Sequence, residues 1–143
     1  MEMNRSVLTK YIICSLMSLM VFGGMMGVSD ASGTSANSYS PSGALDKLKS
    51  SNVRFSSGQS THSNISAERR KQETTGGQHP FATIIACSDS RVPVEILFDQ
   101  GVGDIFVIKV AGNVCNTDEI GSVEYGVDHL DTPVMVVLGH THC

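Results

Sequence analysis

The chain has 143 residues, a net charge of −4 and 41% hydrophobic residues, enough for one domain with its own core. Its 14 aspartate and glutamate residues outnumber its 10 lysine and arginine residues, so it lacks the basic surface that nucleic acids and anionic membranes attract. We therefore expect no nucleic-acid partner.

The first 31 residues have the pattern of a secretory signal peptide. Arg5 and Lys10 precede an uncharged apolar run over residues 11–28, and Ala31 offers a cleavage site. This run also lies at the lower edge of a membrane-spanning length, but serine, glycine and methionine dilute it. We predict a signal peptide over residues 1–31, export to the periplasm, and no membrane attachment after cleavage.

The next part of the chain is polar. Residues 32–43 are rich in serine and glycine and predict a flexible leader. Residues 44–55 place apolar side chains at helical spacing, and we expect a short amphipathic helix that frays over residues 50–52. Residues 66–73 predict a second helix that lacks an apolar stripe and therefore faces solvent or a partner.

From residue 80 onward, short apolar runs alternate with helical patterns. Continuous apolar runs are typical of strands buried on both faces of a parallel sheet; they cover residues 81–86, 105–110 and 134–138. Helices are predicted over residues 94–98, after Pro93, and over 119–130, which places Ile120, Val123, Val127 and Leu130 on one face. The alternation predicts an α/β domain over residues 44–143, with a parallel sheet flanked by helices.

Potential metal ligands follow two of these predicted strands. The motif Cys87-x-Asp89-x-Arg91 comes after the first, and His140-x-x-Cys143 comes after the third. Loops from the carboxyl ends of parallel strands meet at one edge of a sheet, so we expect these motifs to lie together if the strands are neighbours. Two thiolates and one imidazole form a zinc ligand set that leaves one coordination position free, as in catalytic sites.

The residues inside the first motif favour catalysis over a purely structural site. A zinc ion lowers the pKa of bound water and so forms a hydroxide nucleophile near neutral pH. Asp89 is close enough in sequence to bond that water or to occupy the fourth metal position itself, and Arg91 can hold its carboxylate in a forked ion pair. Three cysteines follow the signal, an odd number, which leaves Cys115 as a spare small hydrophobic residue.

The segments ACSDSRVPVEILFDQGVGDIFVIKVAGN, SVEYGVDHL and PVMVVLGHTHC resemble the β-class carbonic anhydrases, and ALDKLKSSNVRFSSG resembles their N-terminal helix. The resemblance implies that zinc is bound by Cys87, His140 and Cys143, and that Asp89 and Arg91 form a catalytic dyad. The implied reaction is the reversible hydration of CO₂ to bicarbonate and a proton. Gln78, Phe106 and Tyr125 match substrate-pocket positions, which in these homodimers or higher oligomers can come from the neighbouring subunit.

The chain departs from the family in two places. It has no tryptophan, and Lys109 stands where some members use an arginine to bind regulatory bicarbonate, so the resemblance does not extend to that site. Family domains also continue beyond the second cysteine ligand with further helices and a strand. We therefore expect the C-terminal part of the domain to be missing from this chain.

Other functions are compatible with the same motifs. Hydrolysis of COS or CS₂ is a close variant, because both molecules are linear like CO₂. A non-catalytic, truncated zinc-binding remnant or interaction module would keep the ligands without turnover. A thiol redox protein using Cys87 and Cys143 would form a disulfide between them in the absence of zinc.

Overall fold

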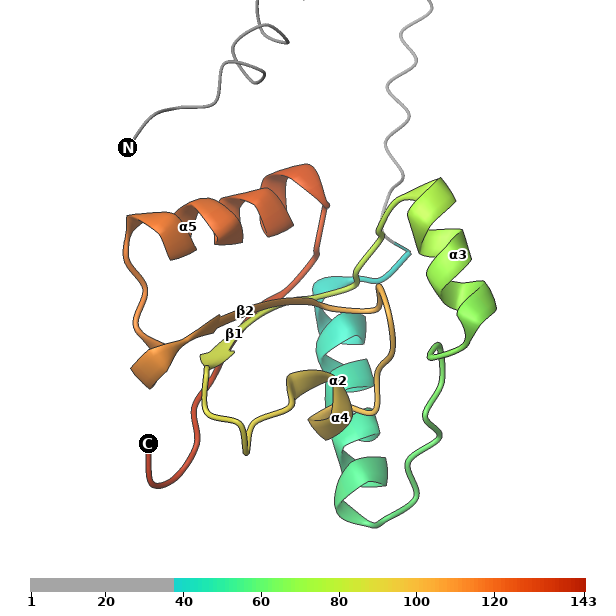
Figure 1. The fold of residues 1–143 in the computed structure, drawn as a ribbon, viewed down its shortest axis with the longest axis horizontal. Helices are drawn as coiled ribbons and strands as arrows, with labels where there is room; N and C mark the ends of the chain where they lie inside the picture. Colours follow the sequence, from blue (N-terminus) through green and yellow to red (C-terminus); the bar gives the residue numbers. More distant parts are fainter. Residues whose placement is uncertain (1–37) are drawn as a thin grey trace, which may run out of the picture. The chain divides into compact units, whose positions relative to one another are not determined.

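The computed structural model describes residues 38–143, which form a three-stranded parallel sheet flanked by helices (Figure 1). This confirms the α/β class predicted from the alternating pattern. The elements, in chain order, are α2 (Pro41–Ser56), α3 (Ala67–Gly76), β1 (Thr83–Cys87), α4 (Val94–Leu97), β2 (Phe106–Val110), η1 (Ala111–Asn113), α5 (Thr117–Glu124), η2 (Tyr125–His129) and β3 (Met135–Leu138).

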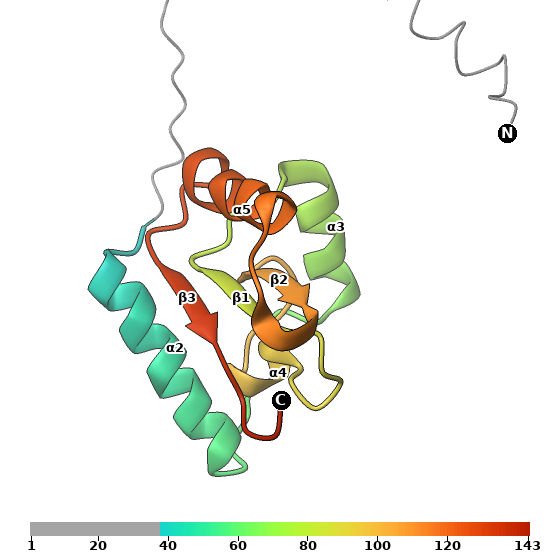
Figure 2. The same cartoon turned by 90° about the vertical axis from the view of Figure 1, so that its left-hand side faces the viewer.

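The strand order is β2-β1-β3, so the first strand of the sequence is the central one (Figure 2). Both neighbours run parallel to β1: Ala86 is paired with Lys109 on one side and with Leu138 on the other. All five residues of β1 are buried, as its continuous apolar sequence predicts. The chain segments that follow β1 and β3 therefore leave the sheet at the same edge.

One face of the sheet packs on α2 and α4, which lie on the side opposite α5 (Figure 1). Ala44 and Leu48 of α2 are fully buried against Ile84 and Ala86 of β1 and Val94 of α4. Helix α2 runs unbroken to Ser56, so the predicted fraying over residues 50–52 is wrong. The reason is tertiary: the hydroxyl of buried Ser51 accepts a hydrogen bond from Gln100 Nε2 at 2.9 Å, in addition to one from Arg54 Nη2 of the same helix at 2.8 Å.

The N-terminal boundary of α2 corrects the predicted leader. The helix begins at Pro41, inside the segment 32–43, because the hydroxyl of Ser40 caps the amide of Gly43 and proline suits a first helical turn. The predicted signal peptide over residues 1–31 and residues 32–37 of the leader lie outside the described residues. Within residues 38–143, no helix is long and apolar enough to cross a membrane.

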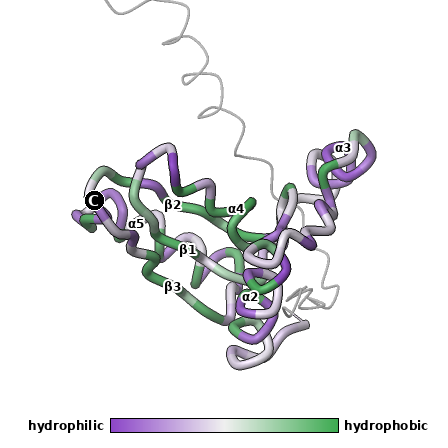
Figure 3. Tube along the Cα trace, turned by 90° about the horizontal axis from the view of Figure 1, so that it is seen from below, coloured by the Kyte–Doolittle hydropathy of each residue, from purple (hydrophilic) through white to green (hydrophobic). Residues whose placement is uncertain are grey.

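The polar helix predicted at residues 66–73 is confirmed as α3, which has no buried residue. Figure 3 shows it as a largely hydrophilic segment, in contrast to the hydrophobic strands. The hydroxyl of Ser66 caps the helix through the amide of Arg69, and Arg69 Nη1 forms an ion pair with Glu73 one turn later at 2.8 Å. Local bonds of this kind, together with contacts from Arg69 to the loop before β2, hold a helix that contributes nothing to the core.

The opposite face of the sheet carries α5 and η2, which together confirm the helix predicted over residues 119–130, although its second half is π-helical. Helix α5 ends at Glu124 and a π-helical turn follows, with the amide of Leu130 bonded to the carbonyl of Tyr125. Gly126 lies so close to Thr83 and Phe106 that a Cβ atom there would collide with both side chains. We infer that this close approach to β1 and β2 sets the change in helical geometry.

The two outer strands are less buried than their apolar sequences predict. Residues of β2 are mostly half-buried, and on β3 Met135 and Val137 are 43% and 61% exposed. On the same side of the fold, Ile120 and Val127 also remain exposed, although the helical spacing predicts a buried stripe. Within residues 38–143, this face of the sheet is covered only in part.

Replacing Leu48 with alanine tests the packing of α2. Leu48 is 1% exposed, so we expect the free energy of unfolding to fall by about 2–5 kcal/mol through lost burial and a residual cavity. Urea unfolding followed by circular dichroism measures the change. Leu45→Ala is the matched control on the same helix: Leu45 is 36% exposed, and we expect a loss of about 1 kcal/mol or less. Equal losses in the two variants would contradict the packing described for α2.

Candidate metal centre

Three potential metal ligands meet beyond the carboxyl ends of β1 and β3. Cys87 is the last residue of β1, and His140 and Cys143 lie in the segment that follows β3 (Figure 2). Because β1 and β3 are direct neighbours, residues more than fifty positions apart reach one place. The ligand atoms of the three residues all lie within 4.8 Å of one another.

The geometry and chemistry of this cluster fit a zinc ion. The sulfur atoms of Cys87 and Cys143 are 3.8 Å apart, and two zinc–sulfur bonds of about 2.3 Å at a tetrahedral angle place sulfurs about 3.8 Å apart. His140 Nε2 is buried and has no hydrogen-bond partner among the described residues, while its Nδ1 lies 3.0 Å from the carbonyl of Thr141. A buried imidazole nitrogen beside two sulfurs, with its other nitrogen already engaged, is the arrangement of a metal ligand.

The surroundings of Cys87 favour its thiolate form. The amide of Asp89 donates to Cys87 Sγ at 3.4 Å, and with the side chain of His140 it lowers the pKa of Cys87 to about 6. The same thiolate raises the pKa of His140 and that of Cys143, because each lies beside a negative sulfur. Cys87 therefore ionises at a lower pH than Cys143, and its thiolate is available to bind a cation.

Asp89 lies at the rim of the cluster and is held by Arg91. The guanidinium donates from Nε to Oδ1 at 3.0 Å and from Nη2 to Oδ2 at 2.7 Å, which is a forked ion pair. These bonds keep the pKa of Asp89 well below its usual range. Oδ2 lies 3.9 Å from His140 Nε2, so the carboxylate borders the open side of the ligand set.

Arg91 also joins the two ligand-bearing segments. Its Nη2 donates to the carbonyl oxygen of His142 at 3.1 Å, next to Cys143. The contact uses the backbone carbonyl of His142, which the residue type does not reveal. Cys115 is exposed and stands apart from the cluster, in agreement with its prediction as a spare cysteine outside the ligand set.

The three substrate-pocket candidates lie elsewhere in the fold. Phe106 begins β2 opposite Thr83, four positions and about 13 Å along the strand from the level of Cys87. The rings of Phe106 and Tyr125 are 5.9 Å apart, and Gln78 is exposed in the loop before β1. All three thus lie at the amino-terminal end of the sheet, and the fold of one chain does not bring them to the metal ligands.

One contact at the centre involves a residue to which sequence reasoning gives no part in the metal site. Lys109 Nζ donates to the carbonyl oxygens of Asp89 and Val92, at the turn that carries Asp89 and Arg91. A signal was present in the sequence: Lys109 is the single charged residue in the three strands among residues 38–143. Lys109 is exposed on an outer strand, and its charge in an otherwise apolar strand singles it out.

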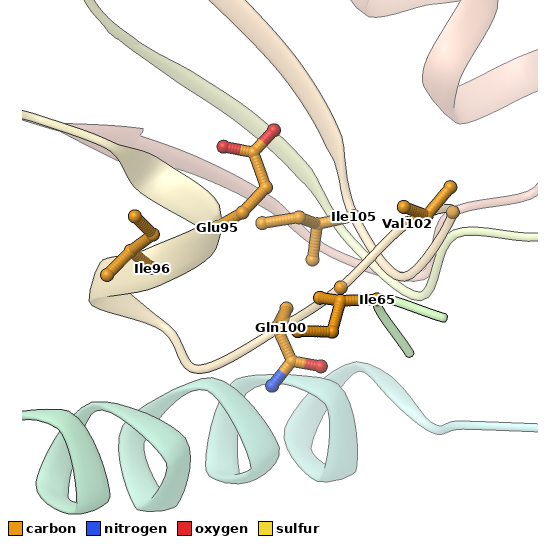
Figure 4. Close-up of a pocket in the computed structure, with 8 residues that line it drawn as sticks. Ile65, Glu95, Ile96, Gln100, Val102 and Ile105 are labelled. Carbon is orange, nitrogen blue, oxygen red and sulfur yellow. The ribbon is translucent and has the colours of Figure 1, made fainter. Parts of the chain in front are cut away.

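A separate groove of about 420 Å³ lies between α4 and the loop before β2 (Figure 4). Its apolar lining includes Ile65, Ile96, Val102 and Ile105, with Glu95 and Gln100 as polar groups. None of the metal-ligand residues lines it. The groove is therefore not the space in which the cysteines and histidine would act.

The family described as carbonic anhydrase has a sequence model that matches residues 82–143. The carbonic anhydrase of Mycolicibacterium smegmatis is 48% identical over 103 residues, which cover 72% of this chain and 50% of that relative. Carbonic anhydrase 2 of Mycobacterium tuberculosis is 46% identical over 103 residues, covering 72% and 49%. The chain thus spans about half the length of the curated relatives that it matches.

Solved structures give the same result. The β-carbonic anhydrase CcaA superposes with a TM-score of 0.50 and 32% identity, over 69% of this chain and 49% of that one. A structure described as one of two tetrameric β-carbonic anhydrases from Sordaria macrospora gives a TM-score of 0.50 and 27% identity, over 69% and 50%. In sequence, in fold and in the motifs that bring two cysteines and a histidine together, this chain belongs to the β-class carbonic anhydrase family.

Proposed function

We propose that this chain carries the zinc site of an enzyme that catalyses the reversible hydration of CO₂ to bicarbonate and a proton. One observation carries the proposal: the ligand atoms of Cys87, His140 and Cys143 lie within 4.8 Å of one another, beside a carboxylate held in a forked ion pair. The relatives named carbonic anhydrase support the same reaction. Zinc, when bound, supplies the Lewis acidity that makes water a nucleophile near neutral pH.

The residues of the site would have two roles, binding the metal and orienting the water. Cys87, His140 and Cys143 would hold the metal, and their two negative sulfurs would neutralise its charge. The Oδ2 atom of Asp89 borders the fourth side of the set, where it would orient a water molecule or accept its proton. Arg91 would keep the carboxylate ionised and aimed at that side, because both of its forked bonds go to Asp89.

We also propose that the working form is a homodimer or a higher homo-oligomer. Gln78, Phe106 and Tyr125 lie at the end of the sheet away from the metal ligands, so a pocket made of both groups needs a second copy. Met135 and Val137 leave an exposed apolar surface on one copy, and burying this surface against a second copy would be favourable. One structural neighbour is described as tetrameric. Export to the periplasm, inferred from residues 1–31, remains part of this proposal.

The test is a stopped-flow assay of CO₂ hydration on the chain loaded with one zinc ion, between about pH 6 and 9. We expect hydration above the buffer rate, and a loss of about 100-fold or more in Asp89→Ala, with zinc still bound because its three ligands remain. A zinc-loaded chain without hydration would contradict the proposal. Full activity in Asp89→Ala would contradict the role given to the carboxylate alone.

A second candidate is a metal-binding module without turnover, because the three ligand atoms lie together whereas the substrate-pocket candidates lie at the other end of the sheet. It predicts stoichiometric zinc binding with no hydration of CO₂. Testing COS and CS₂ in the same assay separates this module from a hydrolase of those molecules. The redox alternative predicts a disulfide between Cys87 and Cys143 in the metal-free chain, whereas zinc-protected free thiols, measured by mass spectrometry, would reject it.

A further inference from the structure

We propose that Lys109 is a positioning residue of the metal centre, which fixes the turn that carries Asp89 and Arg91. The inference rests on the proposed function, because it assigns a role at the same site. The observation behind it is a pair of bonds: Lys109 Nζ donates to the carbonyl oxygen of Val92 at 2.8 Å and to that of Asp89 at 3.3 Å.

The position of Lys109 in the sheet accounts for these bonds. It lies on β2 directly opposite Ala86, the residue before Cys87, so its side chain stands beside the strand end from which the turn departs. Lys109, Ala86 and Leu138 lie side by side across the three strands, and the other two residues are apolar. The ammonium of Lys109 extends beyond the end of β1 to the backbone of the turn.

Other bonds also hold the turn, among them those of Arg91 to Asp89 and to the carbonyl of His142, but within the described part of the chain none of them contacts the carbonyl oxygens at both of its ends. Between β1 and α4, the amide of Val92 bonds to the carbonyl of Asp89 at 3.1 Å, and the amide of Arg91 bonds to Asp89 Oδ1 at 2.8 Å. Lys109 therefore contacts the carbonyl at each end of a four-residue turn. A single charged donor that bridges both ends resists opening of the turn and any rotation of its peptide groups.

This constraint reaches the metal ligands through Asp89. The amide of Asp89 donates to Cys87 Sγ, and its Oδ2 lies 3.9 Å from His140 Nε2, so movement of the turn would change both relations. Lys109 touches no ligand atom of the cluster. Its removal is therefore expected to leave the three ligands present and to alter the environment of the fourth metal position.

The experiment compares Lys109→Met, which removes the charge at similar length, with Lys109→Arg, which keeps a cationic donor. Lys49→Met, at an exposed position of α2, is the matched control. Two properties of the full chain are measured: the visible absorption spectrum of the Co²⁺-loaded protein, and amide hydrogen exchange with Leu97 in α4 as an internal reference. Neither measurement uses catalytic activity, so failure of this inference is distinct from failure of the hydratase proposal.

In Lys109→Met we expect Co²⁺ to bind with the same stoichiometry and an affinity within about tenfold of the parent, but with shifted absorption bands. The amide of Val92 should exchange about tenfold faster, the effect of losing a charged hydrogen bond, while that of Leu97 is unchanged. Lys109→Arg should restore both properties, and Lys49→Met should match the parent.

Unchanged spectra and exchange in Lys109→Met would overturn the inference, as would a failure of Lys109→Arg to restore them. If Lys109→Met does not fold, Lys109→Gln takes its place, because its shorter side chain keeps an uncharged NH₂ donor group but no ammonium. Loss of the fold in both variants, judged by circular dichroism, would also overturn the inference. The ammonium would then be needed for the whole fold and not for this turn.

Discussion

Replacing Cys87 with serine is expected to reduce zinc affinity by more than about 100-fold. The substitution exchanges a thiolate, whose pKa is already lowered to about 6, for a hydroxyl that stays protonated and binds zinc poorly. Competition with a chromophoric chelator measures the affinity. Because metal binding stabilises the folded state, the zinc-loaded parent should also gain a rise in Tm that the variant lacks.

Cys115→Ser is the control for this change. It makes the same chemical substitution at an exposed cysteine outside the cluster. We expect its zinc affinity and stoichiometry to equal those of the parent. If Cys115→Ser lost zinc while Cys87→Ser kept it, the assignment of the metal centre to the end of β1 would be wrong.

Replacing Asp99 with asparagine is expected to lower Tm by at least about 5 °C near neutral pH. The carboxylate follows α4, its side chain is fully buried, and it accepts hydrogen bonds from Arg54 Nε at 2.7 Å and from the amides of Thr61 and His62. It thereby ties α2 to the loop that leads into α3. An amide group would turn two donor hydrogens toward these donors and remove the charge.

The pH dependence of stability supplies an independent check on Asp99. Hydrogen bonds from the Thr61 amide and from Arg54 hold the pKa of Asp99 well below its usual range. A group with a depressed folded-state pKa stabilises the fold above its unfolded pKa of about 3.9, and this contribution is lost as the pH falls toward the folded value. We therefore expect the parent to lose stability between about pH 5 and the acid limit, more steeply than Asp99→Asn.

Asp46→Asn, on the exposed side of α2, is the matched control for both measurements. Thermal unfolding of the three proteins across the same pH range gives the comparison. Tm is expected to change little in Asp46→Asn, because the residue is exposed. If Tm fell with pH to the same extent in the parent and in Asp99→Asn, the carboxylate of Asp99 would not be the group responsible for the loss of stability in acid.

The three strands follow the sequence most closely. Apolar runs predict β1, β2 and β3 within two residues of their observed bounds, because a buried strand needs apolar side chains on both faces. The placement of Cys87 and His140 directly after such runs predicts that they lie at one sheet edge. The apolar runs do not reveal the order of the strands. That order depends on long-range pairing, which makes β1 the central strand.

Where the structure departs from the prediction, a tertiary contact overrides a local pattern. Helical spacing predicts one helix over residues 119–130, but the close approach of Gly126 to Thr83 and Phe106 accompanies a π-helical turn. Polar residues predict fraying over residues 50–52, but Ser51 is buried and hydrogen-bonded to Arg54 and Gln100. The contacts of Gly126 with Thr83 and Phe106, and of Ser51 with Gln100, join segments far apart in the chain, and no local window of sequence contains them.

By itself, the sequence determines the class of the fold, the ligand types Cys87, His140 and Cys143, and the family to which they point. These depend on residue chemistry and on periodicity, which are local properties. Only the tertiary structure decides that Asp89 faces His140, that Lys109 bonds the turn beneath it, and that Phe106 and Tyr125 lie at the other end of the sheet. Those relations are distances between segments far apart in the chain, and strand pairing together with side-chain packing sets them.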